Sequence, residues 1–404
     1  MIPRIDYVRT RRVTNQLVIG LAVLAAGCGQ GAAEDRVRIR KSVELCRSDD
    51  GCRGKNAKVE KMRVLLQSGA RPHWSPDSKS ILFDRRGSDG YADVYMTDLS
   101  GNVSDVTSEK SGIGKKNNGN AVFHPSGDFV VFISEEEKHF LSRNKLMGDP
   151  GLGLYCNLWA TDAKGSKFWQ LTDIPIRRKM FEKTPVVATV NPHFNEDGSM
   201  LVWTERYDRG GNWGKWRVKG ADFVVRGGSP KLENERVLFQ PSTGNYVTAM
   251  GFLGSHRLLV AGNLEGQHEF GMDLYSLNIK SKRVKNLLST PDLWEEGACI
   301  SPDRKRIVFM SNRDSPYKLD QGNKNWASQL LEREYYMINS DGSGLERLTY
   351  FNDSSAKEYL GGRNMVAVCE FSPNGRYIAG TLGIDTGKRK KRALELKLVL
   401  LDLQ

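Results

Sequence analysis

The feature that most constrains the fold is a segment that the chain repeats: an aromatic residue, a tight turn, and a β-branched or aromatic run. In its first copy the aromatic residue is Trp74, the turn is Ser75-Pro76-Asp77, and the run ends at Phe83. A Pro-Asp turn between two such runs predicts two antiparallel strands, and a third strand through Met96 follows. One such unit cannot bury both of its faces alone, so the number of copies determines the architecture.

The segment recurs often enough to predict a closed ring. Five clear turns mark copies one, two, three, five and six: Pro76-Asp77, Pro125-Ser126, Asp197-Gly198, Pro302-Asp303 and Asn374-Gly375. A fourth copy is degenerate at Gly254-Ser255 but keeps its strands, and several copies carry a fourth strand ending in Leu-Thr. The sequence therefore predicts an all-β, six-bladed β-propeller of four-stranded antiparallel blades.

The last copy lacks its fourth strand, because the chain ends just after the third one, near Asp402. A fourth-strand pattern lies instead before the first copy, at Met62 to Ser68, and it matches Arg283 to Ser289. An open propeller would leave unpaired sheet edges. We therefore expect the N-terminal strand to complete the last blade; the alternative is a loose linker with a few apolar residues.

Three strings in these copies resemble a known family. "WSPDS", "SPDRKRIVFMSNRD" and "SDGSGLERLT" look like the propeller repeats of the TolB family, and the resemblance covers about residues 60–404. It implies the fold strongly and the function weakly, because similar propellers also cap serine peptidases and form the bodies of polysaccharide lyases. TolB has an α/β domain before its propeller for which residues 28–57 leave no room, and the chain has no Gly-x-Ser-x-Gly elbow. We therefore do not expect this chain to share TolB's partners, and we do not expect it to have peptidase activity.

The N-terminus has the layout of an export signal. Four arginines within the first twelve residues precede an apolar run from Leu17 to Ala26, which is too short to span a bilayer. The following Gly27-Cys28 resembles a bacterial lipobox, although Ala25 stands where leucine is usual. We predict a lipoprotein signal at 1–27, lipid attachment at Cys28, and a location on the periplasmic side of the cell envelope, with the outer membrane favoured. The alternative is an ordinary signal peptide with a coincidental cysteine.

Charge limits the partners to consider. The net charge of +12 falls to +9 without residues 1–27, which hold four arginines and one aspartate. Nucleic acid is not expected for an exported chain without a recognition motif. An anionic lipid or cell-wall polymer fits such a location as a partner. The simpler interpretation is that the positive charge only makes the surface soluble. The sharpest basic run, at a predicted hairpin tip, is a candidate contact for anionic polymer or a solvated loop: Lys388, Arg389, Lys390, Lys391 and Arg392.

The cysteines suggest one disulfide. Cys46 and Cys52 lie close together in the 28–57 tether, and in an oxidising periplasm this spacing suits a looped disulfide. Cys156, Cys299 and Cys369 are scattered in predicted strands and read as small buried residues.

One end of the propeller is expected to carry the long connections, because turns one-to-two and three-to-four share the opposite end. The long insertions are 134–156, 173–190, 205–215, 225–246, 311–332, 351–365 and 383–393. Loops on a rigid scaffold often carry function. The candidate binding residues on them are His139, Tyr207, Trp213, Trp216 and Trp326. Such residues can equally pin their own loops, and Trp216 can simply begin a strand.

The innermost strands are expected to line an axial channel. The position before each repeat aromatic gives four chemically interesting candidates for its lining: His73, His193, Cys299 and Glu370. These residue types can bind metals, but they come from different blades and lack short-range ligand spacing. We assign no metal, cofactor or catalytic residue.

These observations lead to one expected function and two alternatives. Residues 58–404 form the propeller of a non-enzymatic envelope lipoprotein that holds another envelope protein or a cell-wall component on its loop-bearing end. The first alternative is a carbohydrate-active enzyme, lyase-like, working at the channel mouth. The second is a degenerate propeller that serves only as a spacer.

Overall fold

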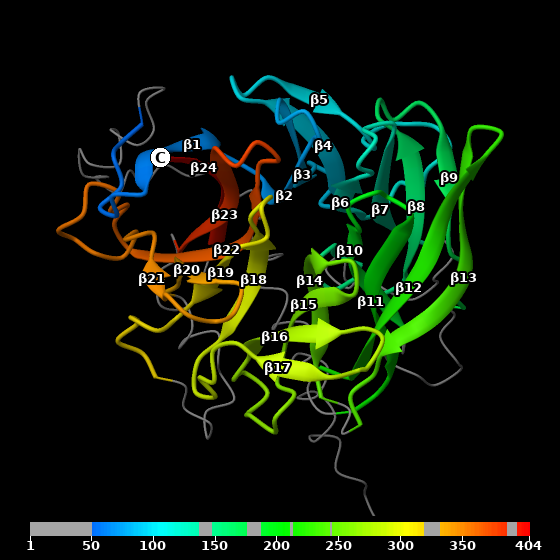
Figure 1. Cartoon of the computed structure of the whole chain (residues 1–404). Helices are drawn as coiled ribbons and strands as arrows, with labels where there is room; N and C mark the ends of the chain where they lie inside the picture. Colours follow the sequence, from blue (N-terminus) through cyan, green and yellow to red (C-terminus); the bar gives the residue numbers. More distant parts are fainter. Residues whose placement is uncertain are drawn as a thin grey trace, which may run out of the picture.

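The computed structural model describes residues 51–136, 148–175, 187–210, 213–242, 245–318, 332–385 and 394–404. These residues form six four-stranded antiparallel sheets arranged as blades around one axis (Figure 1). No helix is present in this part of the chain, and consequently none that is long and apolar enough to cross a membrane. The predicted all-β, six-bladed propeller is confirmed.

Blades one to three take their strands in sequence order, from the axis outwards. Blade one is β2 (Ala70–Trp74), β3 (Ser80–Arg86), β4 (Ala92–Asp98) and β5 (Val103–Asp105). Blade two is β6 (Asn118–Phe123), β7 (Phe129–Glu135), β8 (Cys156–Asp162) and β9 (Phe168–Gln170). Blade three is β10 (Ala188–Phe194), β11 (Met200–Asp208), β12 (Lys215–Arg226) and β13 (Ser229–Phe239).

Blades four and five follow the same order, and blade six joins the two ends of the chain. Blade four is β14 (Val247–Gly254), β15 (Arg257–Gly262), β16 (Asp273–Asn278) and β17 (Val284–Asn286). Blade five is β18 (Glu295–Ile300), β19 (Arg306–Ser311), β20 (Glu334–Asn339) and β21 (Glu346–Arg347). Blade six is β22 (Arg363–Phe371), β23 (Tyr377–Asp385), β24 (Leu394–Leu403) and β1 (Val59–Leu66).

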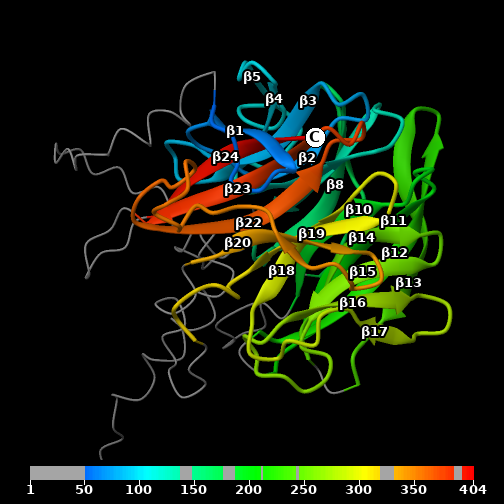
Figure 2. The same ribbon diagram turned by 60° about the vertical axis from the view of Figure 1, so that its left-hand side comes forward.

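The ring closes through β1, as the sequence predicted. β1 pairs antiparallel with β24, with Val64 opposite Val399, and the two strands lie side by side in both views (Figures 1 and 2). Val59 and Met62 of β1 are buried in the core. Closure therefore removes the open edge of β24 and covers apolar side chains at the same time.

The repeated Ser-Pro-Asp turn is stabilised by hydrogen bonds of its own side chains. The Ser75 hydroxyl donates to the Asp77 carboxylate over 2.6 Å and accepts the N–H of Ser80 over 2.9 Å. Blades five and six repeat this pattern from Ser301 and Ser372. Short polar side chains that bond nearby backbone groups favour turns, so the motif fixes where the second strand of each blade begins.

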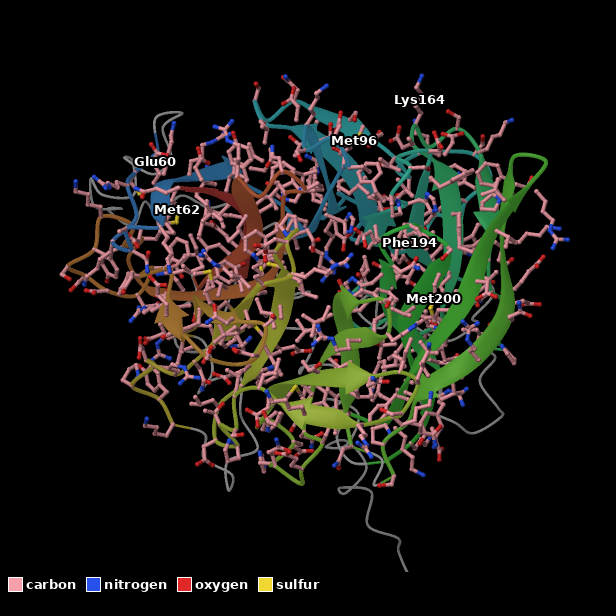
Figure 3. The ribbon with its side chains drawn as sticks, viewed as in Figure 1. Glu60, Met62, Met96, Lys164, Phe194 and Met200 are labelled. Atoms are coloured by element: carbon pink, nitrogen blue, oxygen red, sulfur yellow. The ribbon has the colours of Figure 1, made fainter. Side chains whose placement is uncertain are left out.

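The repeat aromatic joins neighbouring blades. Trp74 is buried, stacks on Tyr377 of blade six at 5.8 Å between ring centroids, and donates its indole N–H to the carbonyl of Glu370 over 3.1 Å. In blade three the same position is Phe194, which Figure 3 shows towards the middle of the molecule, whereas Lys164 lies at the outer rim. Five of the six copies have an aromatic residue at this position, and blade five has Ile300; at Trp74 the ring covers the neighbouring blade.

The Leu-Thr ending has an equally local cause. The Thr349 hydroxyl accepts the N–H of Tyr335 over 2.9 Å and donates to the Glu334 carboxylate over 2.6 Å. Thr107 and Thr172 repeat both bonds in blades one and two. Each threonine fastens a short outer strand to the start of the third strand, where the backbone pairing is only two or three residues long.

Blade three departs from the predicted insertions. Residues 225–246 were expected to form a long loop, but half of them belong to β13, which pairs with β12 through Val225 opposite Pro230. The Gly227-Gly228 turn between these strands has φ values of 56° and 77°, a left-handed conformation that glycine adopts freely. The alternation of charged residues in β13 hid its strand character in the sequence.

Strand direction gives the propeller two distinct ends. We name the end with the one-to-two and three-to-four turns the turn end, and the end with the two-to-three and blade-to-blade connections the loop end. Inner strands run from the loop end to the turn end, so Ala70 lies near the loop end and Trp74 near the turn end.

Candidate functional site: the axial channel

The inner strands that line the axis are bulged at a shared position. Register shifts interrupt the inner pair in every blade, for example between Ala70 and His73 in β2. Non-glycine residues at three of these bulges have positive φ: Arg71 at 52°, Asn120 at 52° and Asn191 at 51°. Asparagine tolerates this conformation better than most residues, whereas arginine does so only under constraint.

Side chains from the second strands accept hydrogen bonds from backbone N–H groups at the bulges. The Asp84 carboxylate of β3 accepts the N–H of Asn120 over 3.0 Å. In the same way the Thr204 hydroxyl accepts the N–H of Ala249 over 2.8 Å, and the Thr381 hydroxyl accepts the N–H of Arg71 over 2.9 Å. Each bond joins one blade to the next one. The polar residues around the channel therefore help to hold the ring together.

Three of the four predicted channel residues lie where the two cavities of the channel adjoin. His73, His193 and Glu370 line both of the cavities described below, and we call this part of the channel the waist. Burial and the neighbouring His193 lower the pKa of His73 to about 3, and burial lowers the pKa of His193 to about 4. Burial raises the pKa of Glu370 to about 8. All three groups are therefore uncharged at neutral pH.

The prediction for the fourth residue, Cys299, needs a correction. Cys299 does not line the cavities; it is fully buried between β18 and β22. Its Sγ lies 2.6 Å from the Sγ of Cys369, and both residues are free thiols. Cys369 instead borders the cavity. The physical reason is packing between blades, because the Cys299 side chain contacts Cys369 of the neighbouring blade six.

The loop-end cavity has a volume of about 90 Å³, room for several water molecules. It contains a group of residues that the sequence did not single out. Glu296 accepts the indole N–H of Trp294 over 2.9 Å and the Tyr246 hydroxyl over 3.3 Å. Arg333 lies against the Trp294 ring, 4.7 Å from its centroid. Burial raises the pKa of Glu296, although these hydrogen bonds and Arg333 oppose the rise.

The turn-end cavity is wider, about 340 Å³, and is bordered by the repeat turns. An ion pair of 2.6 Å between Arg304 and Glu196 links the turns of blades five and three beside it. Both side chains are substantially solvent-exposed, so this pair contributes little to stability. The two cavities share lining residues and together make the channel.

The two predicted binding tryptophans donate hydrogen bonds to backbone carbonyls of their own loop and of a neighbouring connection. Trp216 is buried in β12 and donates its indole N–H to the Trp213 carbonyl over 2.8 Å, so it offers no surface to a partner. Trp213 donates to the carbonyl of Glu269 over 2.8 Å and packs edge-on against Phe270. Tyr207 is partly exposed, with Arg217 over its ring at 5.0 Å. Of the described candidates Tyr207 and Trp213 are partly exposed, whereas Trp216 is buried.

The remaining predicted residues lie outside the described part of the chain. This holds for His139, Trp326, Cys28, Cys46 and the basic run Lys388, Arg389, Lys390, Lys391 and Arg392. Cys52 is disulfide-bonded, but its predicted partner lies outside the described residues. The Cys46–Cys52 pairing and the polymer contact stay predictions.

A metal centre finds no support in the described residues. Among them no group of three or more His, Cys, Asp or Glu side chains is placed to hold an ion. The channel's imidazoles are two, His73 and His193, and His73 already accepts the N–H of Phe123 over 3.3 Å.

The sequence carried one unused signal for the channel. Arg71-Pro72-His73 and Asn191-Pro192-His193 repeat a polar-Pro-His pattern at the bulges of blades one and three. This repetition points to Arg71 and Asn191. No comparable pattern marks Glu296, which lies on the inner strand β18, or Arg333, which directly precedes β20.

Comparison with known proteins supports the fold. No family model matches the chain, and no curated protein matches it. Among solved structures, a putative TolB from Agrobacterium tumefaciens is 14% identical, with a TM-score of 0.48, over 83% of this chain and 90% of that one. TolB from Acinetobacter baumannii is 13% identical, with a TM-score of 0.50, over 81% of this chain and 64% of that one.

A third similar structure is an oligogalacturonate lyase in complex with manganese, 14% identical, with a TM-score of 0.48, over 88% of this chain and 96% of that one. Identities this low reflect a common architecture and do not transfer an activity or a ligand. With six four-stranded blades, a ring closed by β1 and the repeat turns in register, the chain has a TolB-like β-propeller.

Proposed function

We propose that this chain is a non-enzymatic, lipid-anchored protein of the bacterial cell envelope that holds an envelope protein or a cell-wall component on the loop end of its propeller. The observation that carries the proposal is the difference between the two ends. At the turn end, the repeat turns use their polar side chains on their own backbone, as Ser75 and Asp77 do. At the loop end, polar side chains such as Arg71, Glu296 and Arg333 border the channel mouth.

Charge and the N-terminal sequence support the location. A chain of net charge +9 after residue 27 suits a surface rich in anionic lipid and polymer. The lipobox-like sequence before Cys28 would place the propeller there. Replacing Cys28 by serine should abolish labelling with radioactive palmitate and release the protein from the membrane fraction. Retention of both label and membrane association by Cys28→Ser would contradict the anchor.

Photo-crosslinking from individual positions tests the docking end. A benzophenone amino acid is placed at exposed loop-end residues (Asp89, Glu109, Lys357) and, as matched controls, at exposed turn-end residues (Lys79, Asp197, Lys305). Irradiation of living cells should give discrete adducts from the loop-end positions and none from the turn-end positions. Adducts only from the turn end, or none from either end, would overturn the proposed surface.

One observation favours a second candidate, a lyase-like carbohydrate-active enzyme. Glu296, whose pKa burial raises, lies near Arg333 at the loop-end mouth, and such a lyase needs a base beside a cation. The test is ultraviolet absorbance of unsaturated products after incubation with uronic-acid polysaccharides. Activity that is lost in Glu296→Gln would support this candidate. Absence of product from every polysaccharide would leave the binding function as the better account.

A further inference from the structure

Arg333 is a buried cation for which the described residues provide no anionic partner at ion-pair distance. Its side chain is enclosed next to β20, and its backbone is fixed by an N–H bond of 3.2 Å to the Asn364 carbonyl and by the Val366 N–H, 3.3 Å from its own carbonyl. The guanidinium contacts the Met310 sulfur at 3.6 Å and the Trp294 ring. Its Nε is buried and has no hydrogen-bond partner among the described residues.

Two other buried cations show what Arg333 lacks. Arg71 forms ion pairs with Asp84 and Asp149, and these carboxylates raise its pKa despite burial. Lys219 likewise forms ion pairs with Glu205 and Glu235. By contrast, burial lowers the pKa of Arg333 to about 10, with only Glu296 opposing the change.

Burying the Arg333 guanidinium without an ion-pair partner costs free energy. Removing an ion from water costs several kcal/mol unless a counter-charge and hydrogen bonds replace the water. Stacking on an aromatic ring returns only about 0.5–2 kcal/mol. The site is therefore short of one acceptor, preferably a charged one.

The cavity beside Arg333 provides room for that acceptor. Arg333 and Arg71 both line the loop-end cavity, and the Nη1 of Arg71 is also buried, with no hydrogen-bond partner in the described part of the chain. Most other lining side chains are apolar, with methionines on three blades: Met250, Met310 and Met365. A ligand that fits this lining combines one anionic group with a small apolar body. Methionines adapt readily to such a body.

We propose that the loop-end cavity binds a small apolar monocarboxylate, whose carboxylate accepts hydrogen bonds from Arg333 and from the free Nη1 of Arg71. A planar carboxylate matches the donor geometry of a guanidinium. A dianion such as phosphate is disfavoured, because it would add two negative charges near Glu296, Asp84 and Asp149. This inference goes beyond the proposed function, because a small ligand in the channel requires no partner on the loop end.

Calorimetric titration of the whole protein with benzoate and butyrate tests the site, with the neutral isosteres benzamide and butanamide as ligand controls. Benzoate or butyrate should bind with one-to-one stoichiometry, at least tenfold more tightly than its amide. Binding should weaken at least tenfold in Arg333→Met and less in Arg333→Lys. It should be unchanged in Arg226→Met, which removes an exposed arginine from β12.

A second measurement separates a binding role from a structural one. Without ligand, Arg333→Met should melt at the same or a higher temperature, because it removes an unpaired buried charge. Benzoate should raise the melting temperature of the natural protein and not that of Arg333→Met. The proposal is overturned if neither acid gives saturable heat at tens of millimolar, or if Arg333→Met binds as tightly as the natural protein.

Discussion

The Nδ2 of Asn120 donates to the Oδ1 of Asn191 over 2.9 Å, joining the bulges of blades two and three inside the channel. Asn191 in turn donates to the Thr248 hydroxyl of blade four over 2.8 Å. Both asparagines have positive φ, so the strained backbone and the interblade bonds occur at the same residues.

Replacing Asn120 should therefore lower stability by two separable effects. Asn120→Ala loses the Nδ2 bonds to Asn191 and to the Pro150 carbonyl, and it puts alanine, which tolerates the left-handed conformation less well than asparagine, at this φ of 52°, at an expected cost of about 2 kcal/mol. Asn120→Gly loses the same bonds without a left-handed penalty, so it should cost less, about 1 kcal/mol. Urea unfolding followed by fluorescence measures both. Equal stability of Asn120→Ala and the natural protein would show that the interblade bond is not stabilising.

The Leu-Thr threonine should be sensitive to loss of its hydroxyl and tolerant of loss of its methyl group. Thr349→Val keeps the shape but leaves the Tyr335 N–H and the buried Glu334 carboxyl without that partner, so unfolding should become easier by about 2 kcal/mol. Thr349→Ser is the control and should lose less than half as much. If valine and serine variants unfold at the same urea concentration, packing rather than hydrogen bonding explains the repeat.

Glu370 should make the protein less stable as pH rises. Its pKa is raised from 4.5 to about 8 by burial, so the folded state keeps a proton that the unfolded state releases above pH 4.5. This group's unfavourable contribution therefore grows between pH 4.5 and 8 and is constant above that range. Glu370→Gln should raise the melting temperature at pH 8 and leave it unchanged at pH 4. The histidines at the waist act in the opposite sense, since their lowered pKa values reduce stability as pH falls below 6.5, and they are the same in both proteins.

The melting curves of Glu370→Gln and the natural protein should thus diverge steadily from pH 4.5 to pH 8. Curves that stay parallel over this range would mean that Glu370 titrates normally, as a carboxyl in contact with channel water does.

Removing β1 should open the ring. β1 contributes the buried side chains of Val59, Met62 and Leu65, each worth roughly 2 kcal/mol, so their sum rivals the stability of a typical domain. A chain that begins at Gly69 should aggregate or melt far below the chain that retains β1, because β24 then has a free edge. A synthetic peptide of residues 58–67 should restore part of the melting temperature. An unchanged melting temperature without β1 would contradict closure by this strand.

Much of the fold was predictable because its causes are local. The turn at Ser75-Pro76-Asp77 and the ending at Thr349 are stabilised by side chains within a few residues of their partners or on the adjacent strand. Such patterns are visible in sequence, and counting them gave the blades and the pairing of β1 with β24. The failure at β13 has a local cause as well, since its many charged residues resemble a loop.

The candidate site was less predictable. His73, His193 and Glu370 were found because a fixed position in the repeat faces the axis. The sequence did not show that Trp216 is buried or that Trp213 bonds to the Glu269 carbonyl, because whether an aromatic residue faces solvent or a neighbouring loop depends on how blades three and four pack.

The sequence by itself determined the repeat, the number of blades and the strand that closes them, since each follows from short-range patterns of turns and apolar residues. Only the tertiary structure decided that Arg333, Arg71 and Glu296 border one cavity and that Cys299 packs against Cys369. The physical reason is that these contacts join different blades, where the packing of one sheet on the next, and not spacing along the chain, sets which side chains meet.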